Sequence, residues 1–121
     1  MLIYKELSEL IIGAAIEVHT HLGPGFLESV YQHAMEKEMT TRGIPFKPQD
    51  PLPVVYKGEL MGKFRPDFLV DEKIVVEIKA VSAFVPEHTA KAIHYLTATG
   101  MKLALLINFG KYRLEVKRVI L

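Results

Sequence analysis

The chain has 121 residues, with 15 lysines and arginines against 14 aspartates and glutamates, a formal net charge of +1. Such a length can bury a core, and we expect residues 1–121 to form one domain. The near-neutral charge argues against binding through a strongly basic surface, although an enzyme acting on nucleic acid needs only local positive charge. The absence of cysteine excludes disulfides and cysteine-ligated zinc, and it fits a reducing, cytoplasmic location.

Two amphipathic helices are predicted at the start of the chain. Apolar residues recur every three or four positions over about residues 3–21, and Gly23 and Pro24 end this first helix. A second helix is expected over residues 26–41. The apolar stripes are Leu7, Leu10, Ile11, Ala14, Ala15, Val18 and Leu22 in the first helix and Leu27, Val30, Tyr31, Ala34, Met35 and Met39 in the second. The longest apolar run, residues 10–16, is too short to cross a bilayer, so we expect no membrane association.

The middle of the chain changes to strand and turn signals. Four prolines between residues 44 and 60 exclude a helix there and suit a loop or an edge strand. Residues 54–56 predict a strand that enters a turn at Lys57 and Gly58. A β-hairpin is expected over about residues 62–80, because apolar and β-branched segments lie on both sides of a charged turn.

The last third of the chain predicts one helix and two strands. The helix is expected over residues 86–99, with Pro86 at an allowed first-turn position and Gly100 as its cap. The strands are expected over residues 103–108 and 113–120. The resulting order, ααβββαββ, predicts an α/β fold in which helices flank a central sheet of about five strands.

Three charged residues interrupt the apolar hairpin: Asp67, Glu77 and Lys79. Burial of a charge is unfavourable unless the charge is paired, hydrogen-bonded or bound to a metal. Because strand side chains alternate between faces, Glu77 and Lys79 share one face. Asp67 joins them if it lies opposite Glu77, which requires an odd-length turn of three or five residues. The same register places the apolar side chains at positions 68, 70, 74, 76 and 78 on the other face.

Two explanations of this charged patch stay open. Asp67 and Glu77, together with the backbone carbonyl of Ile78, would supply hard oxygen ligands suited to Mg²⁺ or Mn²⁺. Such an ion stabilises charge on a phosphate group and lowers the pKa of a bound water, and Lys79 would lie next to that water. Alternatively, Lys79 forms a cross-strand salt bridge with one of the two carboxylates.

Two motifs resemble a known nuclease family. The pattern P-D, nine residues, then E-I-K at residues 66–79 resembles the PD-(D/E)xK signature of the restriction-endonuclease-like nuclease superfamily. The G-x-x-E-x-x-Y motif that names a small bacterial family within this superfamily matches residues 25–31. Similarity to this GxxExxY family extends over residues 11–31, 75–80 and 103–108. The resemblance implies a restriction-endonuclease-like core with a mixed central sheet, and nuclease activity that depends on Mg²⁺ or Mn²⁺.

The resemblance also implies roles for residues on the helices. Superfamily members often have an acidic residue where Glu28 stands, so Glu28 is a candidate third metal ligand, either directly or through a water. The helix dipole favours a glutamate there in any case. Tyr31 is expected in the core with its hydroxyl at the edge of the site. Superfamily members often have a glutamine four residues before a tyrosine. Here Lys91 precedes Tyr95, and Lys91 either contacts a phosphate or pairs with Glu87 on the surface.

Two further residues complete the candidate substrate contacts. Arg65 stands directly before the P-D pair, where it either reaches a phosphate or pairs with a surface carboxylate. His19 falls in the segment that resembles the family and is expected to line the cleft.

The leading hypothesis is therefore a metal-dependent phosphodiesterase acting on DNA, with RNA as a second candidate substrate. The alternative is an inactive module with the nuclease fold that binds nucleic acid or a protein partner, for example as a homodimer. Only the enzyme is expected to bind a divalent ion at Asp67 and Glu77.

Overall fold

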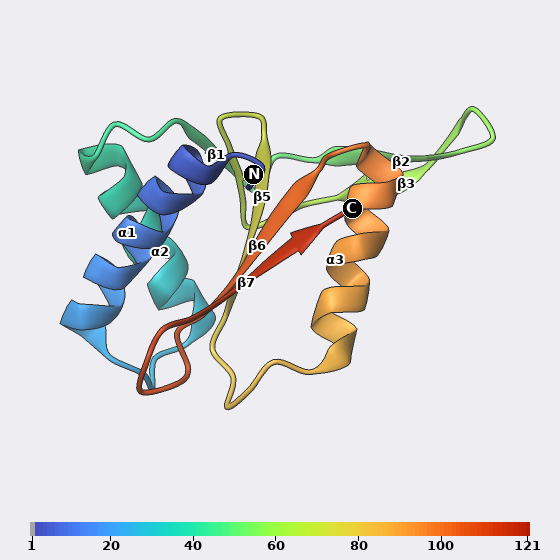
Figure 1. Cartoon of the computed structure of the whole chain (residues 1–121). Helices are drawn as coiled ribbons and strands as arrows, with labels where there is room; N and C mark the ends of the chain where they lie inside the picture. The colour runs from blue at the N-terminus through green and yellow to red at the C-terminus, as the bar shows by residue number, and fades with distance from the viewer. Residues whose placement is uncertain (1) are drawn as a thin grey trace.

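The computed structural model describes residues 2–121 and shows a five-stranded mixed sheet with helices on both faces (Figure 1). The elements in chain order are α1 (Lys5–Leu22), α2 (Glu28–Thr41), β1 (Phe46–Pro48), β2 (Leu52–Tyr56), β3 (Glu59–Phe64), β4 (Phe68–Val70), β5 (Ile74–Lys79), α3 (Pro86–Thr99), β6 (Leu103–Asn108) and β7 (Glu115–Ile120). The strand order of the main sheet is β1-β4-β5-β6-β7. Among the strands of residues 2–121, only β5 and β6 are parallel neighbours. The predicted fold class is confirmed.

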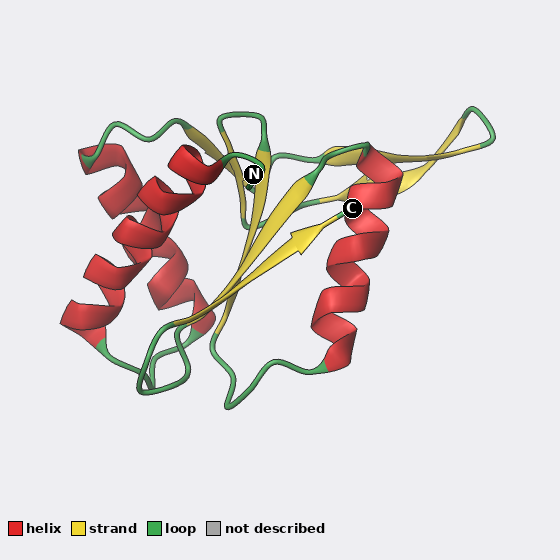
Figure 2. Ribbon diagram, in the orientation of Figure 1, coloured by secondary structure: helices red, strands yellow, loops and turns green. Residues whose placement is uncertain are grey.

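Each face of the sheet carries its own apolar cluster. Val76 and Ile78 of β5 pack with the buried side chains of α1 and α2. On the other face, Val75 and Leu106 pack with Ala92 and Leu96 of α3. The two helical layers are visible on either side of the strands in Figure 2. Because successive strand residues point to opposite faces, the neighbours of a core residue on β5 face the opposite layer.

The helix α3 forms the crossover between the parallel strands β5 and β6. Parallel neighbours need a long connection, and a helix packed on the sheet supplies it. Pro86 begins the helix, and Gly100 ends it with a φ of 76°, a left-handed conformation that glycine adopts without strain. The predicted bounds of α3 and β6 are confirmed.

Three residues assigned to the apolar stripes of the first two helices lie on the surface instead. Leu10 of α1, and Leu27 and Val30 at the start of α2, are exposed. The two helices pack through narrower stripes, in which Ile11, Ala14, Ala15 and Val18 of α1 and Tyr31, Met35 and Met39 of α2 are buried. The prediction that Leu10, Leu27 and Val30 belong to the core was therefore wrong.

The predicted register of the β4–β5 hairpin is confirmed. Phe68 lies opposite Val76, Leu69 opposite Val75, and Val70 opposite Ile74. The turn between the strands has three residues, 71–73, and its first two have positive φ. The odd length keeps the apolar alternation of both strands on one face, as expected.

The segment before this hairpin differs from the prediction. Residues 62–64 belong to β3, which pairs with β2 in a separate two-stranded sheet. Figure 1 shows this β2–β3 hairpin projecting past α3. A short strand, β1, also joins the edge of the main sheet, so five strands rather than three lie between α2 and α3. Pro66 explains the break between β3 and β4, because proline has no N–H to donate to a strand ladder.

Among residues 2–121, no helix is both long and apolar enough to cross a membrane.

Candidate active site

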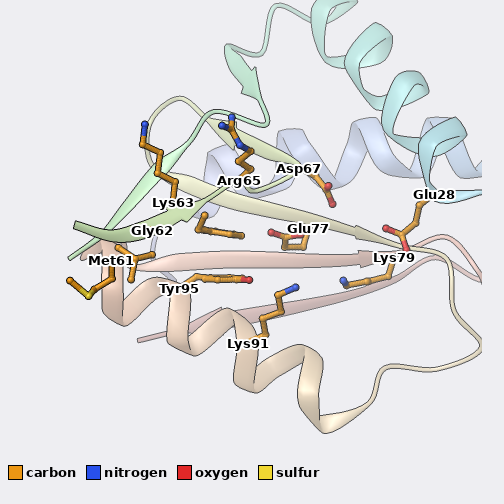
Figure 3. Close-up of a pocket in the computed structure, with 12 residues that line it drawn as sticks. Glu28, Met61, Gly62, Lys63, Arg65, Asp67, Glu77, Lys79, Lys91 and Tyr95 are labelled. Atoms are coloured by element: carbon orange, nitrogen blue, oxygen red, sulfur yellow. The ribbon is translucent and has the colours of Figure 1, made fainter. Parts of the chain in front are cut away.

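An open cleft of about 520 Å³ lies between β5, α3, the β2–β3 hairpin and the start of α2 (Figure 3). Seven of the nine candidate side chains line this cleft: Glu28, Arg65, Asp67, Glu77, Lys79, Lys91 and Tyr95. These residues come from four separate parts of the chain, and the fold brings them to one place. The other two candidates, His19 and Tyr31, do not line the cleft.

Asp67 is held against β5 by a hydrogen bond. The Ile78 N–H donates to Asp67 Oδ2 at 2.7 Å. Strand β4 begins one residue later, at Phe68, so the side chain of Asp67 rather than its main chain makes this link to β5. Because one carboxylate oxygen is fixed in this way, the Asp67 side chain is ordered before any ligand binds.

Glu77 carries a buried oxygen without a partner. Its Oε1 atom makes no hydrogen bond. Burial, and after it the nearby negative charge of Asp67, raises the pKa of Glu77 from an ordinary 4.5 to about 8, while Lys79 and Lys91 act in the opposite direction. A buried carboxylate beside a second carboxylate is unfavourable without a cation, so this pair suits a divalent ion.

The acidic residues of the cleft fit a metal that is held by few protein ligands. Among residues 2–121, no three histidine or acidic side chains lie close enough together to hold a metal ion by themselves. Mg²⁺ commonly takes one or two carboxylates and keeps several waters, so Asp67 and Glu77 are a sufficient side-chain pair. Glu28 lines the same cleft from the first residue of α2. The Ile78 carbonyl and Glu28 remain predicted ligands.

The cleft also concentrates positive charge. Lys63, Arg65, Lys79 and Lys91 line it together with three acidic residues. The rest of the chain has eleven basic and eleven acidic residues, so the net charge of +1 resides at the cleft. This local excess favours an anionic ligand, although the protein as a whole is nearly neutral.

Lys79 is free for a role at the cleft. In the part of the chain that the structure describes, the ion pairs involve other basic residues, and Lys79 pairs with neither Asp67 nor Glu77. Figure 3 shows its side chain directed into the cleft near Glu77. The alternative explanation from the sequence, a cross-strand salt bridge, is therefore absent in this structure.

A stack of three side chains ties α3 to the β2–β3 hairpin. The Lys91 ammonium lies 5.6 Å from the centre of the Tyr95 ring. The Tyr95 ring in turn stacks on Phe64 of β3, with ring centres 3.4 Å apart and planes at 9°. This stack forms one wall of the cleft. The contributions of Lys63 and Phe64 were missed in the sequence, because residues 62–64 were assigned to the strand that leads into Asp67.

Tyr31 positions the start of α2 rather than lining the cleft. The Tyr31 hydroxyl donates to the Gly23 carbonyl at 2.6 Å and accepts from the Phe26 N–H at 3.1 Å. Its buried ring stacks on Phe109, with ring centres 4.7 Å apart. These contacts fix the connection that leads directly into Glu28. The G-x-x-E-x-x-Y spacing thus places the acidic residue at the cleft and its anchor one helical turn away in the core.

Replacement of Tyr31 by phenylalanine is expected to destabilise the protein by about 1–2 kcal/mol, because Phe26 loses an acceptor and Gly23 loses a donor. Urea unfolding of the variant measures this change. Tyr56→Phe is the matched control, because Tyr56 is exposed, and it is expected to leave stability unchanged. Equal stability of both variants would show that the Tyr31 hydroxyl does not fix the connection.

His19 holds the turn after β6. Its Nε2 lies 2.9 Å from the Lys111 carbonyl oxygen, and its ring lies 6.0 Å from the Phe109 ring. Because a carbonyl oxygen accepts, Nε2 donates this hydrogen bond. His19 therefore contacts the β6–β7 turn, whereas the sequence placed it at the cleft.

Asn108 is another residue that sequence reasoning missed. It is fully buried at the end of β6, opposite Lys79 of β5. Its amide group donates to the Val81 carbonyl and accepts from the Val81 N–H, both at 3.0 Å. The bonds fix the chain directly after Lys79. The sequence feature that could have indicated this role is a polar residue, Asn108, at the end of an otherwise apolar strand.

The fold is shown by a solved structure with low sequence identity. A chain titled "Crystal structure of SSO0001" matches with a TM-score of 0.59 and 17% identity over 97% of this chain. The present chain spans 57% of that chain. An alkaline exonuclease (LHK-Exo) from Laribacter hongkongensis also matches, with a TM-score of 0.45 and 12% identity, over 93% of this chain and 81% of that chain. No curated protein matches.

These features define an α/β fold with a carboxylate pair and a lysine at one end of a sheet hairpin. The family model of the PD-(D/E)XK nuclease superfamily matches residues 5–119. The chain belongs to this superfamily.

Proposed function

We propose that the protein is a metal-dependent phosphodiester hydrolase that cleaves DNA or RNA. The observation that carries this proposal is the Asp67–Glu77 pair, with its buried unpaired oxygen, in a cleft lined by four basic side chains. We also infer that the chain belongs to the GxxExxY family within the superfamily. The support for this finer assignment is the role of Tyr31 in fixing the segment before Glu28.

The acidic residues are assigned to metal binding. Asp67 and Glu77 would hold Mg²⁺ or Mn²⁺, with the Ile78 carbonyl as a further ligand and Glu28 reaching the ion through a water. When bound, such an ion neutralises charge on the scissile phosphate and lowers the pKa of an attacking water. Glu77 must lose its proton to act as a ligand, because its pKa is about 8 in the free protein.

The basic and aromatic residues are assigned to substrate and water. The Lys79 ammonium orients the attacking water and stabilises the negative charge that develops on the phosphate. Arg65 and Lys91 bind neighbouring phosphates of the nucleic acid, and the Phe64–Tyr95 stack keeps Lys91 at the wall of the cleft. Phosphate contacts of this kind carry no sequence information, so we expect little sequence preference.

Cleavage by the purified protein tests this function. We expect Mn²⁺-dependent hydrolysis of DNA or RNA that stops in EDTA. Lys79→Ala should lower kcat by about a hundredfold, because it removes a group that acts on the water and the developing charge, while the Mn²⁺ affinity stays within a fewfold of wild type. Equal kcat values for wild type and Lys79→Ala would contradict the role given to Lys79.

The alternative is a nuclease-fold module that binds nucleic acid or a protein partner without cleavage. The absence of a third acidic side chain close to Asp67 and Glu77, among residues 2–121, favours this alternative. Binding of oligonucleotides without hydrolysis of DNA or RNA in either Mg²⁺ or Mn²⁺ would support it over the enzyme.

A further inference from the structure

The turn between β6 and β7 presents an aromatic ring to solvent between two basic residues. Tyr112 is 89% exposed, the highest value among the large hydrophobic side chains of residues 2–121. Lys111 and Arg113 flank it in the sequence. An aromatic side chain exposed to water does not gain the free energy of burial, so the exposed Tyr112 ring does not stabilise the fold in this way.

The backbone of the turn is fixed although the ring is exposed. The Gly110 N–H donates to Asn108 Oδ1 at 2.9 Å, and the Lys111 carbonyl accepts from His19. A Cβ on residue 110 would lie 2.4 Å from the Val81 main chain, so only glycine allows this close approach. Lys111 also pairs with Glu115 at 3.3 Å. The Tyr112 ring is therefore presented from an ordered support, which reduces the entropy lost on binding a ligand.

The turn is joined directly to β5, the strand that carries Glu77 and Lys79. The Phe109 N–H donates to the Lys79 carbonyl at 2.8 Å, and Asn108 lies opposite Lys79. Tyr112 is four residues beyond Asn108, a span of at most about 14 Å, and adjacent strands are about 5 Å apart. Tyr112 thus lies within about 20 Å of Lys79. Figure 1 shows the turn beside the α1–α2 connection that leads into Glu28.

We propose that Tyr112 stacks on a base of single-stranded nucleic acid whose backbone occupies the cleft, with Arg113 on an adjacent phosphate. This inference rests on the proposed function and names its substrate form. Single strands expose the faces of their bases, and every base has a face that an aromatic ring can stack on. Stacked nucleotides advance about 3.4 Å each, so at most about six separate the Lys79 end of the cleft from Tyr112.

A single introduced tryptophan tests the stacking, because the chain contains no tryptophan. Tyr112→Trp is titrated in EDTA with an oligothymidylate of about eight nucleotides, within the usual range of single-strand sites. We expect its fluorescence to be quenched by stacking. Leu10→Trp is the matched control, because Leu10 is exposed and lies nine residues before His19 on α1, about 14 Å along the helix, so its indole should not respond. An abasic strand of the same length should quench neither variant.

Binding of the same oligonucleotide gives the second readout. Tyr112→Ala should raise Kd about tenfold, equivalent to about 1.4 kcal/mol, whereas Tyr112→Phe should bind like wild type. Equal Kd values for wild type and Tyr112→Ala, or equal quenching of the Tyr112→Trp and Leu10→Trp variants, would overturn the proposal, as would equal quenching by duplex of the same length. Because no metal is present, these results are independent of cleavage, and a failure of the catalytic assignment would leave them unchanged.

Discussion

Replacement of Glu77 by alanine is expected to lower Mn²⁺-dependent cleavage by at least about a thousandfold. The variant loses one of two side-chain ligands, and the charge stabilisation that a bound ion supplies amounts to several kcal/mol, at about 1.4 kcal/mol for each tenfold in rate. Rates of DNA and RNA cleavage at saturating Mn²⁺, compared with wild type, give the measurement.

The matched control for this variant is Glu9→Ala, which removes an exposed glutamate of α1 whose ion pair with Lys5 is 4.0 Å long. It is expected to cleave at the wild-type rate. Circular dichroism and unfolding must show that Glu77→Ala is folded. Cleavage by folded Glu77→Ala within tenfold of wild type would remove Glu77 from the reaction.

The metal-free protein is expected to lose stability as pH rises from about 5 to about 9. The pKa of Glu77 is raised to about 8 in the folded state by burial and then by Asp67. Between about pH 4.5 and pH 8, the folded protein therefore keeps the Glu77 proton that the unfolded protein has lost. The contribution of this proton to the free energy of unfolding is complete below about pH 4.5 and disappears as pH rises through 8. If the full shift in the pKa of Glu77 contributes, the free energy of unfolding falls by roughly 3–5 kcal/mol over this range.

Urea unfolding in EDTA at several pH values measures this effect. Glu77→Gln has no proton to lose, so the difference in free energy of unfolding between it and wild type isolates the contribution of Glu77 from that of the histidines. The variant should become the more stable protein above about pH 8. A difference that stays constant from pH 5 to pH 9 would show that Glu77 ionises normally. Mn²⁺ should reverse the trend, because the ion binds the ionised form.

The hairpin that carries the site could be predicted from the sequence, because two physical constraints act together. Alternation fixes which residues share a face, and the three-residue turn fixes how the two strands are aligned. These constraints place Asp67, Glu77 and Lys79 on one face of the hairpin without knowledge of the rest of the fold. Helix α3 was equally accessible, because Pro86 and Gly100 mark its two ends.

The rest of the cleft depends on tertiary contacts that local sequence patterns predict poorly. Strand β1 has only three residues, too few for an alternating pattern to be recognised. The β2–β3 hairpin is mostly exposed, so its sequence lacks the apolar alternation of a core strand, and its Phe64 meets Tyr95 only when α3 folds over the sheet. Asn108 likewise contacts Val81 across 27 residues of chain.

The start of α2 was also predicted incorrectly, because the exact end of a helix depends on tertiary contacts. Leu27 stands one residue before Glu28 and was assigned to the apolar stripe, yet it is 77% exposed. The helix begins at Glu28 rather than at residue 26, so Leu27 has an extended backbone that turns its side chain away from the core. A difference of two residues at a helix end thus decides which side chains reach the cleft and which reach solvent.

The central claim is that Asp67 and Glu77 hold a divalent ion. Anomalous scattering from crystals soaked in Mn²⁺ at a pH above 8, where Glu77 is ionised, tests it most directly. We predict an anomalous peak between the two carboxylates, lost in crystals of Glu77→Gln treated in the same way. No peak in wild-type crystals, with the Lys79 ammonium bonded to Asp67 or Glu77 instead, would contradict the claim.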